Sequence, residues 1–377
     1  MQTGAAELSN SNLFINIQNI QANVKRIREE LPAGAALLPV LKCDAYGLGL
    51  VPVAEAVLRT GCVQTLAVAQ VSEAVRLREA GVGADILVIG AAASDAQIVA
   101  AAGNDILLTV PQPGFVARAA ELLRPRRLHL RVHIKINSGL NRLGSAPGPE
   151  LDAVIGELRD AADVVEVAGV FSHFSDLDGG GELLWPEYDR YMRALERLSD
   201  AGIAHGMRHM CASASFERHP ELALDGVRIG RRLYYNHLED PDGPIRDVAS
   251  WRALITDVRA RRAGDRLGYG GAYVLGEDAV IATVGVGYGD CSLLARLAAV
   301  HAPVLIGGKR CRLVGCCMDQ CFAVASGTGC AVGDTATLLG FDERGNLLPG
   351  QEVAALIGDE ACSITAALGS RVQRIYE

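Results

Sequence analysis

The sequence predicts a two-domain α/β protein, with an N-terminal TIM-type (β/α)8 barrel followed by a mainly β C-terminal domain. From residue 36 to 228, eight short apolar runs alternate with helical patterns, an order typical of such a barrel. From residue 251 onward, short apolar runs are separated by glycine turns, which indicates β structure. The length of 377 residues fits a barrel of roughly 200 to 250 residues plus a second domain.

Apolar periodicity predicts the elements of the first domain. A strand at 13–17 comes first, followed by a helix at 18–31 whose apolar residues Ile20, Val24 and Ile27 have helical spacing. The eight barrel strands are predicted at 36–41, 65–69, 85–89, 106–110, 128–136, 164–171, 208–211 and 223–228. The helices between them include 51–60, 71–80, 96–102 and 151–160.

The second domain is predicted from six further apolar runs and one small helical element at 359–368. The runs lie at 272–275, 279–286, 304–306, 312–314, 321–324 and 335–339. A polar, proline-containing linker at 236–244 separates the two parts. We therefore place the barrel at 13–240 and the β domain at 245–377, with residues 1–12 as a candidate addition to the latter.

Composition and charge narrow the class of protein. Half of the residues are apolar and 21% are charged, as in a globular protein. The net charge of −8 argues against nucleic acid or an anionic membrane as partner. The chain contains no apolar run approaching about 18 residues, and its start lacks a basic region followed by an apolar one. We expect a cytoplasmic protein without a membrane partner.

Five of the ten cysteines lie between Cys311 and Cys330. They form no Cys-x-x-Cys pair and have no interleaved histidine, so we expect no metal site there. Thiols that act as small apolar residues in a reducing compartment explain them better.

Lys42 ends the apolar run at 36–41 and is followed by a tyrosine and a glycine-rich turn. Burying an unpaired ammonium costs several kcal/mol, so a lysine here calls for a chemical explanation. One is a Schiff base to pyridoxal phosphate, and another is a lysine whose head reaches solvent. The chain has only four lysines; Lys25 is expected on a polar helix face and Lys309 in a glycine turn, so a Schiff-base role falls to Lys42 or Lys135.

Five polar residues lie at or shortly after the carboxyl ends of predicted barrel strands: Lys42, Lys135, His173, Ser213 and Arg228. Such ends open toward one mouth of a barrel, where active sites are found. Each residue alone has an ordinary explanation, such as an ion pair or a core histidine, but together they indicate a functional mouth. Gly230 and the Ser213 hydroxyl lie where barrels commonly hold a phosphate.

Six motifs in order resemble the alanine racemase family, PLP enzymes with a barrel followed by a β domain. The resemblance runs from about Leu13 to Tyr376. The motifs are the segments 41–49 (LKCDAYGLG), 139–144 (GLNRLG), 172–174 (SHF), 227–230 (VRIG), 286–290 (VGYGD) and 317–320 (CMDQ).

The resemblance implies a cofactor site in the barrel. Lys42 resembles the PLP lysine, and Arg228 resembles the arginine that faces the pyridine nitrogen and leaves it unprotonated. The residues that would hold the phosphate are Tyr46, Ser213, Gly230 and the N–H of Arg231. Arg142 resembles the group near the substrate and near the phenolic oxygen of PLP. Lys135 resembles a lysine that is carbamylated.

The resemblance also implies a homodimer with shared active sites and an amino-acid substrate, most simply alanine. Tyr288 resembles the second base, acting from the partner subunit on the opposite face from Lys42. His173 resembles the link between Tyr288 and Arg228, and the Met318 backbone resembles a contact for the substrate carboxylate.

The sequence departs from the family pattern at several positions near these residues. Ala212 stands where asparagine is usual, Arg231 and Arg232 where a small or apolar pair is usual, Leu48 where histidine is usual, and Cys291 where glycine is common. Ser370 stands where some members carry a tyrosine, which predicts room for a slightly larger substrate such as serine.

Three alternatives remain open. The chain also resembles serine/alanine racemases that carry such a unit behind a membrane domain, and would then be a soluble part of a longer protein. It resembles related PLP decarboxylases at the lysine strand, but has Gly287-Tyr288-Gly289-Asp290 and Met318-Asp319-Gln320 where that group differs. The last alternative is a non-catalytic PLP-binding homologue.

Overall fold

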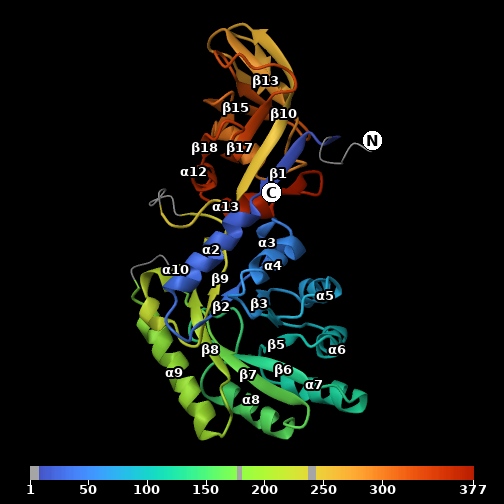
Figure 1. Cartoon of the computed structure of the whole chain (residues 1–377), viewed down its shortest axis with the longest axis vertical. Coiled ribbons are helices and arrows are strands. Elements are labelled where there is room, and N and C mark those ends of the chain that lie inside the picture. Colours follow the sequence, from blue (N-terminus) through green and yellow to red (C-terminus); the bar gives the residue numbers. More distant parts are fainter. Residues whose placement is uncertain (1–7, 176–180, 237–242) are drawn as a thin grey trace. The chain divides into compact units, whose positions relative to one another are not determined.

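The computed structural model describes residues 8–175, 181–236 and 243–377 (Figure 1). The chain divides into two compact units. The barrel unit comprises Val24–Ala45 and Leu50–Leu233. The β unit comprises Tyr46–Gly49, the described residues from Tyr234 onward and those up to Asn23.

The barrel unit is built on eight parallel strands in the order β2-β9-β8-β7-β6-β5-β4-β3. A parallel bridge between Val40 and Ala67 joins β2 to β3 and closes the ring. All eight predicted strands are present, with ends that shift by up to three residues. Their bounds are β2 (Ala36–Pro39), β3 (Thr65–Val68), β4 (Asp85–Val88), β5 (Leu107–Val110), β6 (Leu130–Lys135), β7 (Val165–Phe171), β8 (Met207–Ala212) and β9 (Gly226–Ile229).

Helices surround these strands in Figure 1. In α8 (Pro149–Asp160) the buried residues Leu151, Val154, Ile155 and Leu158 follow the helical period. The others are α4 (Leu50–Leu58), α5 (Val71–Glu79), α6 (Asp95–Gly103), α7 (Phe115–Leu123), α9 (Leu184–Asp200) and α10 (Ser213–Arg218). The helix α2 (Ile17–Glu30) begins in the β unit and ends in the barrel unit.

The β unit is organised around β10 (Ala249–Arg261), which pairs with β1 (Ser11–Ile15), β13 (Ala279–Val284) and β17 (Thr335–Phe341). Its nine-stranded sheet has the order β18-β17-β14-β15-β16-β13-β10-β1-β19. The remaining strands are β14 (Pro303–Ile306), β15 (Lys309–Cys316), β16 (Cys321–Val324), β18 (Leu347–Leu348) and β19 (Gln373–Tyr376), with a separate hairpin of β11 (Arg266–Leu267) and β12 (Tyr273–Val274).

Trp251 anchors the core of this sheet. Its side chain is fully buried, and its indole N–H donates to the Ser11 hydroxyl at 2.8 Å, which ties β10 to β1. Three short helices lie among the strands: α11 (Leu294–Ala299), α12 (Gly350–Ala355) and α13 (Ala361–Ala366).

The predicted fold class is therefore confirmed: a parallel eight-stranded barrel unit and a mainly β unit. The domain bounds 13–240 and 245–377 stay a prediction, and most of the predicted linker, 237–242, lies outside the described residues. Within the described parts of the chain, helices long and apolar enough to cross a membrane are absent.

Candidate active site

Lys42 lies where the sequence places it, just past the carboxyl end of β2. The Leu41 N–H donates to the Ala67 carbonyl at 2.7 Å, and the Val40 N–H to the Ile229 carbonyl at 2.7 Å. These bonds to both neighbouring strands fix the backbone that leads into Lys42, whose side chain is half-buried. The backbone before Lys42 is thus held by the closure of the barrel.

A left-handed turn follows, within the element α3 (Lys42–Tyr46). Cys43, Asp44, Ala45 and Tyr46 all have φ between 53° and 58°. For residues other than glycine this conformation costs roughly 1–2 kcal/mol each and is usually found singly. Four in succession therefore need support from the surrounding structure, and such strain is concentrated at functional sites.

The segment after this turn is held within the β unit. A Cβ added at Gly47, whose φ is +82°, would come 1.9 Å from the Thr365 carbonyl oxygen, so only glycine fits there. The Arg374 side chain donates to the Gly47 carbonyl at 3.1 Å, and the Tyr376 hydroxyl to the Leu48 carbonyl at 3.1 Å. The Tyr46 ring lies 5.4 Å from the ring of the buried Tyr234.

Arg228, at the carboxyl half of β9, is buried without a carboxylate partner in the described chain. Its NH1 donates to His209 Nδ1 at 2.6 Å, and its NH2 to the Ser172 carbonyl at 2.7 Å and to His173 Nδ1 at 3.1 Å. Burial lowers the pKa of Arg228 to about 10, which leaves it protonated at neutral pH. Its Nε–H makes no hydrogen bond within the described residues and is available to a ligand.

Two histidines that the sequence argument missed extend this network. Because Arg228 only donates, Nδ1 of His209 and of His173 must accept, and each ring carries its proton on Nε2. His209 Nε2 then donates to His133 Nδ1, at 2.8 Å. His133 and His209 lie inside the predicted strands 128–136 and 208–211. A polar residue within an apolar run was the feature of the sequence that could have identified them.

These three imidazoles predict an acid-labile fold. Burial lowers the pKa of His133 to about 3, that of His173 to about 2 and that of His209 well below its ordinary value. Below pH ~6.5 the unfolded chain binds protons that the folded chain does not, so each histidine lowers the free energy of unfolding by about 1.4 kcal/mol per pH unit. We expect urea unfolding curves to give a lower free energy of unfolding at pH 5.5 than at pH 7.

Two variants control this prediction. His133→Phe should lower the pH slope by about one proton, whatever its effect on stability at pH 7. His219→Gln, which removes a histidine outside the cluster, is the variant for comparison. Equal slopes for wild type and His133→Phe would contradict the assignment.

Lys135 ends β6 and is 3% exposed. Its Nζ lies 3.3 Å from the Ile136 carbonyl and 3.4 Å from the Ser172 hydroxyl, and no carboxylate pairs with it in the described chain. Burial, followed by the charges of Arg228 and Arg142, lowers the pKa of Lys135 well below its usual range. Both effects favour the neutral form of the amine, which is the nucleophilic one.

The predicted phosphate-binding residues are partly brought together. The Gly230 N–H donates to the Ser213 hydroxyl at 3.2 Å, and Ser213 is 8% exposed. Arg231 is half-buried, whereas Arg232 turns away to pair with Glu30 and with Glu217, the latter at 2.8 Å. Arg232 is thus a structural residue of the barrel unit.

The barrel mouth is strongly cationic. Arg228, Arg142 and Lys42 carry positive charges that lower the pKa of His173, after the larger effect of burial. Glu187 is a carboxylate that acts on Lys135 in the opposite direction, and its oxygens accept from the Ser175 N–H at 2.8 Å and from the Ser175 hydroxyl. A site with this charge balance suits an anionic ligand such as a phosphate or a carboxylate.

Tyr288 and Met318 lie in the β unit on adjoining loops. The Tyr288 N–H donates to the Cys317 carbonyl at 3.0 Å. Tyr288 is 42% exposed and Met318 is 59% exposed. Asp290 braces this loop, because its Oδ2 accepts from the Gly287 N–H at 2.9 Å and its Oδ1 lies 2.9 Å from Arg371 Nε. Ser370 is exposed next to Arg371.

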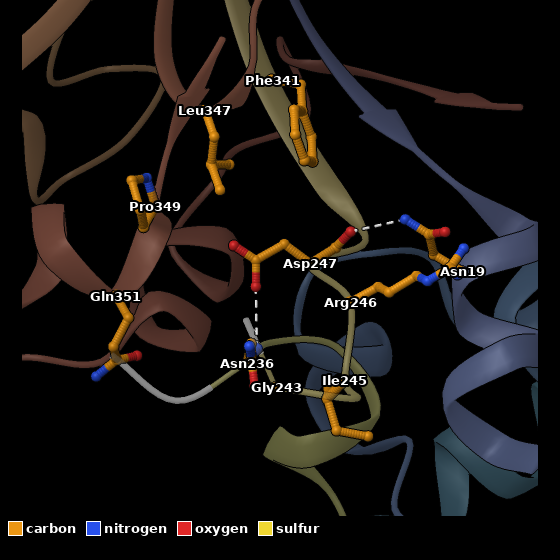
Figure 2. A pocket seen from close by; sticks show the side chains of 10 residues that line it. All are labelled: Asn19, Asn236, Gly243, Ile245, Arg246, Asp247, Phe341, Leu347, Pro349 and Gln351. Carbon is orange, nitrogen blue, oxygen red and sulfur yellow. Dashed lines mark hydrogen bonds between the residues drawn. The ribbon is translucent and has the colours of Figure 1, made fainter. Parts of the chain in front are cut away.

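A separate pocket of about 350 Å³ in the β unit holds none of the predicted site residues. Figure 2 shows the Asp247 carboxylate at its centre, with Phe341 and Leu347 among the apolar walls. The carboxylate accepts from the Asn236 N–H at 2.9 Å, and burial raises the pKa of Asp247. This pocket thus shares no residue with the site predicted at the barrel mouth.

The fold and the barrel mouth define a class of protein: an α/β barrel with a β domain and a lysine-bearing cationic site at the strand ends. Comparisons with known proteins specify the family. Residues 15–237 match "Alanine racemase, N-terminal domain" and residues 248–376 match "Alanine racemase, C-terminal domain". The chain belongs to the alanine racemase family.

Individual relatives match along nearly the whole chain. An alanine racemase of Desulforamulus reducens is 34% identical over 373 residues, covering 96% of this chain and 97% of its own. One of Desulfovibrio desulfuricans is 31% identical, covering 96% of both chains. The crystal structure of alanine racemase from Bacillus anthracis with bound L-Ala-P superposes with a TM-score of 0.90 at 30% identity, covering 98% of this chain and 95% of that one.

Proposed function

We propose that this protein is a PLP-dependent amino-acid racemase that interconverts L- and D-alanine. The observation that supports it best is the cationic barrel mouth, where Arg228 is buried among imidazole and carbonyl acceptors and keeps one N–H for a ligand. The match to alanine racemases over both domains indicates which reaction uses such a mouth.

The residues present fit pyridoxal phosphate. Lys42 would hold it covalently, and Ser213, Gly230 and the Arg231 N–H, together with Tyr46, would hold its phosphate. The Nε–H of Arg228 would donate to the pyridine nitrogen and keep it unprotonated, since a guanidinium does not give up its proton at neutral pH. The chemistry that this cofactor supplies when bound is stabilisation of the negative charge left on the α-carbon.

Two bases on opposite faces of the substrate would carry the protons. The Lys42 amine takes the α-proton from one face and the Tyr288 hydroxyl returns a proton to the other, or the reverse for the other enantiomer. A free phenol has a pKa near 10, so a tyrosine that acts as a base requires a hydrogen-bond donor to stabilise its deprotonated oxygen. His173, whose proton is on Nε2, is suited to donate to Tyr288 while Arg228 holds its Nδ1.

We further propose a homodimer in which Tyr288 and Met318 complete the partner's site. Both side chains are substantially exposed in the single chain, on loops braced by backbone hydrogen bonds. The Met318 backbone would contact the substrate carboxylate, and Arg142 would lie near the phenolic oxygen of the cofactor.

An α-proton exchange assay in deuterated water tests the function. With PLP-loaded protein and L-alanine, we expect deuterium at the α-carbon together with inversion and without release of carbon dioxide. Release of carbon dioxide would instead identify a decarboxylase, and a cofactor absorbance band without any exchange would identify a binding protein.

Carbamylation of Lys135 is a further prediction. The lowered pKa favours the neutral amine, which can attack carbon dioxide, forming an N–C bond and releasing one proton, and the resulting carbamate would face Arg142. With ¹³C-labelled bicarbonate, we expect a carbamate carbon signal that is absent in Lys135→Ala, together with about tenfold lower racemisation in that variant. Lys25→Ala is the matched control; a Lys135→Ala variant with full activity and the same spectrum would contradict this proposal.

Serine is a second candidate substrate because Ser370 is small and exposed near the Tyr288 loop. A tyrosine introduced there, Ser370→Tyr, is expected to lower the ratio of serine to alanine turnover. An unchanged ratio would remove the reason for this alternative. We also propose a reducing, cytoplasmic location, since the ten cysteines form no disulfide in the described chain. Titration of ten reduced thiols in freshly purified protein tests it.

A further inference from the structure

The left-handed turn after Lys42 is held by a carboxylate from the neighbouring helix. Glu73 Oε1 accepts from the Cys43 N–H at 2.6 Å. That N–H belongs to the peptide group that joins Lys42 to Cys43, so this bond fixes the backbone on the carboxyl side of Lys42. The strand bonds of Val40 and Leu41 fix the other side.

Helix capping does not explain both oxygens of Glu73. Glu73 is the third residue of α5, and its Oε2 accepts from the Ala69 N–H at 2.8 Å and from the Gln70 N–H at 3.0 Å, which caps the helix. The next helix, α6, is capped in the same way by Gln97.

Gln97 shows what capping alone requires. Its single oxygen Oε1 accepts from both the Ala93 N–H at 2.7 Å and the Ser94 N–H at 3.2 Å. One acceptor oxygen therefore suffices at this position. The second oxygen of Glu73 is the part of the side chain that serves the turn after Lys42.

The same helix supports the turn at a second point. Asp44 Oδ1 accepts from the Leu50 N–H at 3.1 Å and from Arg76 NH2 at 3.3 Å, and Arg76 lies one turn after Glu73 in α5. Residues in a sparsely populated backbone region persist only where their surroundings hold them. Helix α5 supplies that support from the barrel unit.

We infer that Glu73 is a positioning residue for Lys42: its second carboxylate oxygen holds the Lys42–Cys43 peptide in the left-handed turn and thereby sets the direction of the lysine side chain. The effect on turnover rests on the proposed function, whereas the effect on the backbone does not. The two are therefore measured separately.

Glu73→Gln is the sharpest variant. A glutamine can satisfy the two capping N–H groups with its oxygen, as Gln97 does, but then its NH2 faces the Cys43 N–H and that bond is lost. Hydrogen–deuterium exchange of residues 42–46, in protein without added cofactor, should become about tenfold faster, while the start of α5 is unchanged. Gln97→Ala, which removes the cap of α6, is the matched control and should leave 42–46 unchanged.

With PLP and alanine, Glu73→Gln should lower kcat about tenfold with little change in KM, because Lys42 is misdirected and not removed. The α-deuterium isotope effect should rise only in the direction in which Lys42 takes the α-proton, which a general loss of stability would not produce. In the Glu73→Gln background, Cys43→Asn should recover part of the loss, since asparagine tolerates the left-handed region.

Unchanged exchange at 42–46 in Glu73→Gln, or equal acceleration in Gln97→Ala, overturns the inference. A wild-type protein that fails to racemise would overturn the proposed function instead, and the exchange experiment would still decide the role of Glu73. Should Glu73→Gln not fold, Glu73→Asp, which keeps the charge but shortens the reach to Cys43, serves the same comparison.

Discussion

Lys42→Ala is expected to abolish both the absorbance band of protein-bound PLP and racemisation. Alanine cannot bind the cofactor covalently, and it removes one of the two proposed bases. We expect activity to fall about a thousandfold or more. Absorbance after dialysis against PLP and a racemisation assay with either enantiomer measure the two effects.

Stability provides the control for this variant. Lys42 is half-buried and precedes the strained turn, so its truncation leaves the Glu73 and strand hydrogen bonds in place. The melting temperature of the cofactor-free protein should change little. Lys25→Ala should retain both the band and the activity. A Lys42→Ala protein that keeps the wild-type band would move the cofactor to another lysine, with Lys135 as the first to test.

Tyr288→Phe is expected to keep the PLP band and to lose about 10²–10⁴-fold in racemisation, the usual contribution of a positioned acid or base. Phenylalanine keeps the ring but cannot give or take a proton. Because Tyr288 is 42% exposed in the single chain, the loss of its hydroxyl should change monomer stability little. Absorbance, racemisation rate and α-proton exchange are measured on the same sample.

Mixing the two inactive variants tests whether the bases come from different subunits. In a mixed dimer of Lys42→Ala and Tyr288→Phe, one site carries both changes and the other carries neither. Random exchange of subunits should then recover about a quarter of wild-type activity. Full activity of Tyr288→Phe alone would refute the two-base assignment, and mixed samples without recovery would argue that both bases act within one chain.

Much of the barrel could be predicted from sequence because its strands are buried on both faces. Runs such as 65–69 and 106–110 are apolar at every position but one, a threonine, and the helices between them repeat at the helical period. The lysine at the end of one such run, and the polar residues near the ends of others, pointed to a mouth. The role proposed for each of those residues came from the motifs that resemble a known family.

The β domain was less predictable because its pairing is distant in sequence. The predicted strand near the start of the chain pairs with β10, with Ser11 opposite Ala253 and Ile15 opposite Ala249. Helical periodicity and apolar runs describe only the nearest residues, so neither the length of β10 nor its partners follow from them.

Apolar patterns and motifs were enough to predict the class of fold, the order of the two domains and the lysine at the centre of the proposed site. How that lysine is held became visible only in the folded chain. The hydrogen bond from Cys43 to Glu73 spans 30 positions, and that between His133 and His209 spans 76. The physical reason is that a carboxylate or an imidazole acquires its role from the groups that surround it, and in a barrel these come from neighbouring strands and helices far away along the chain.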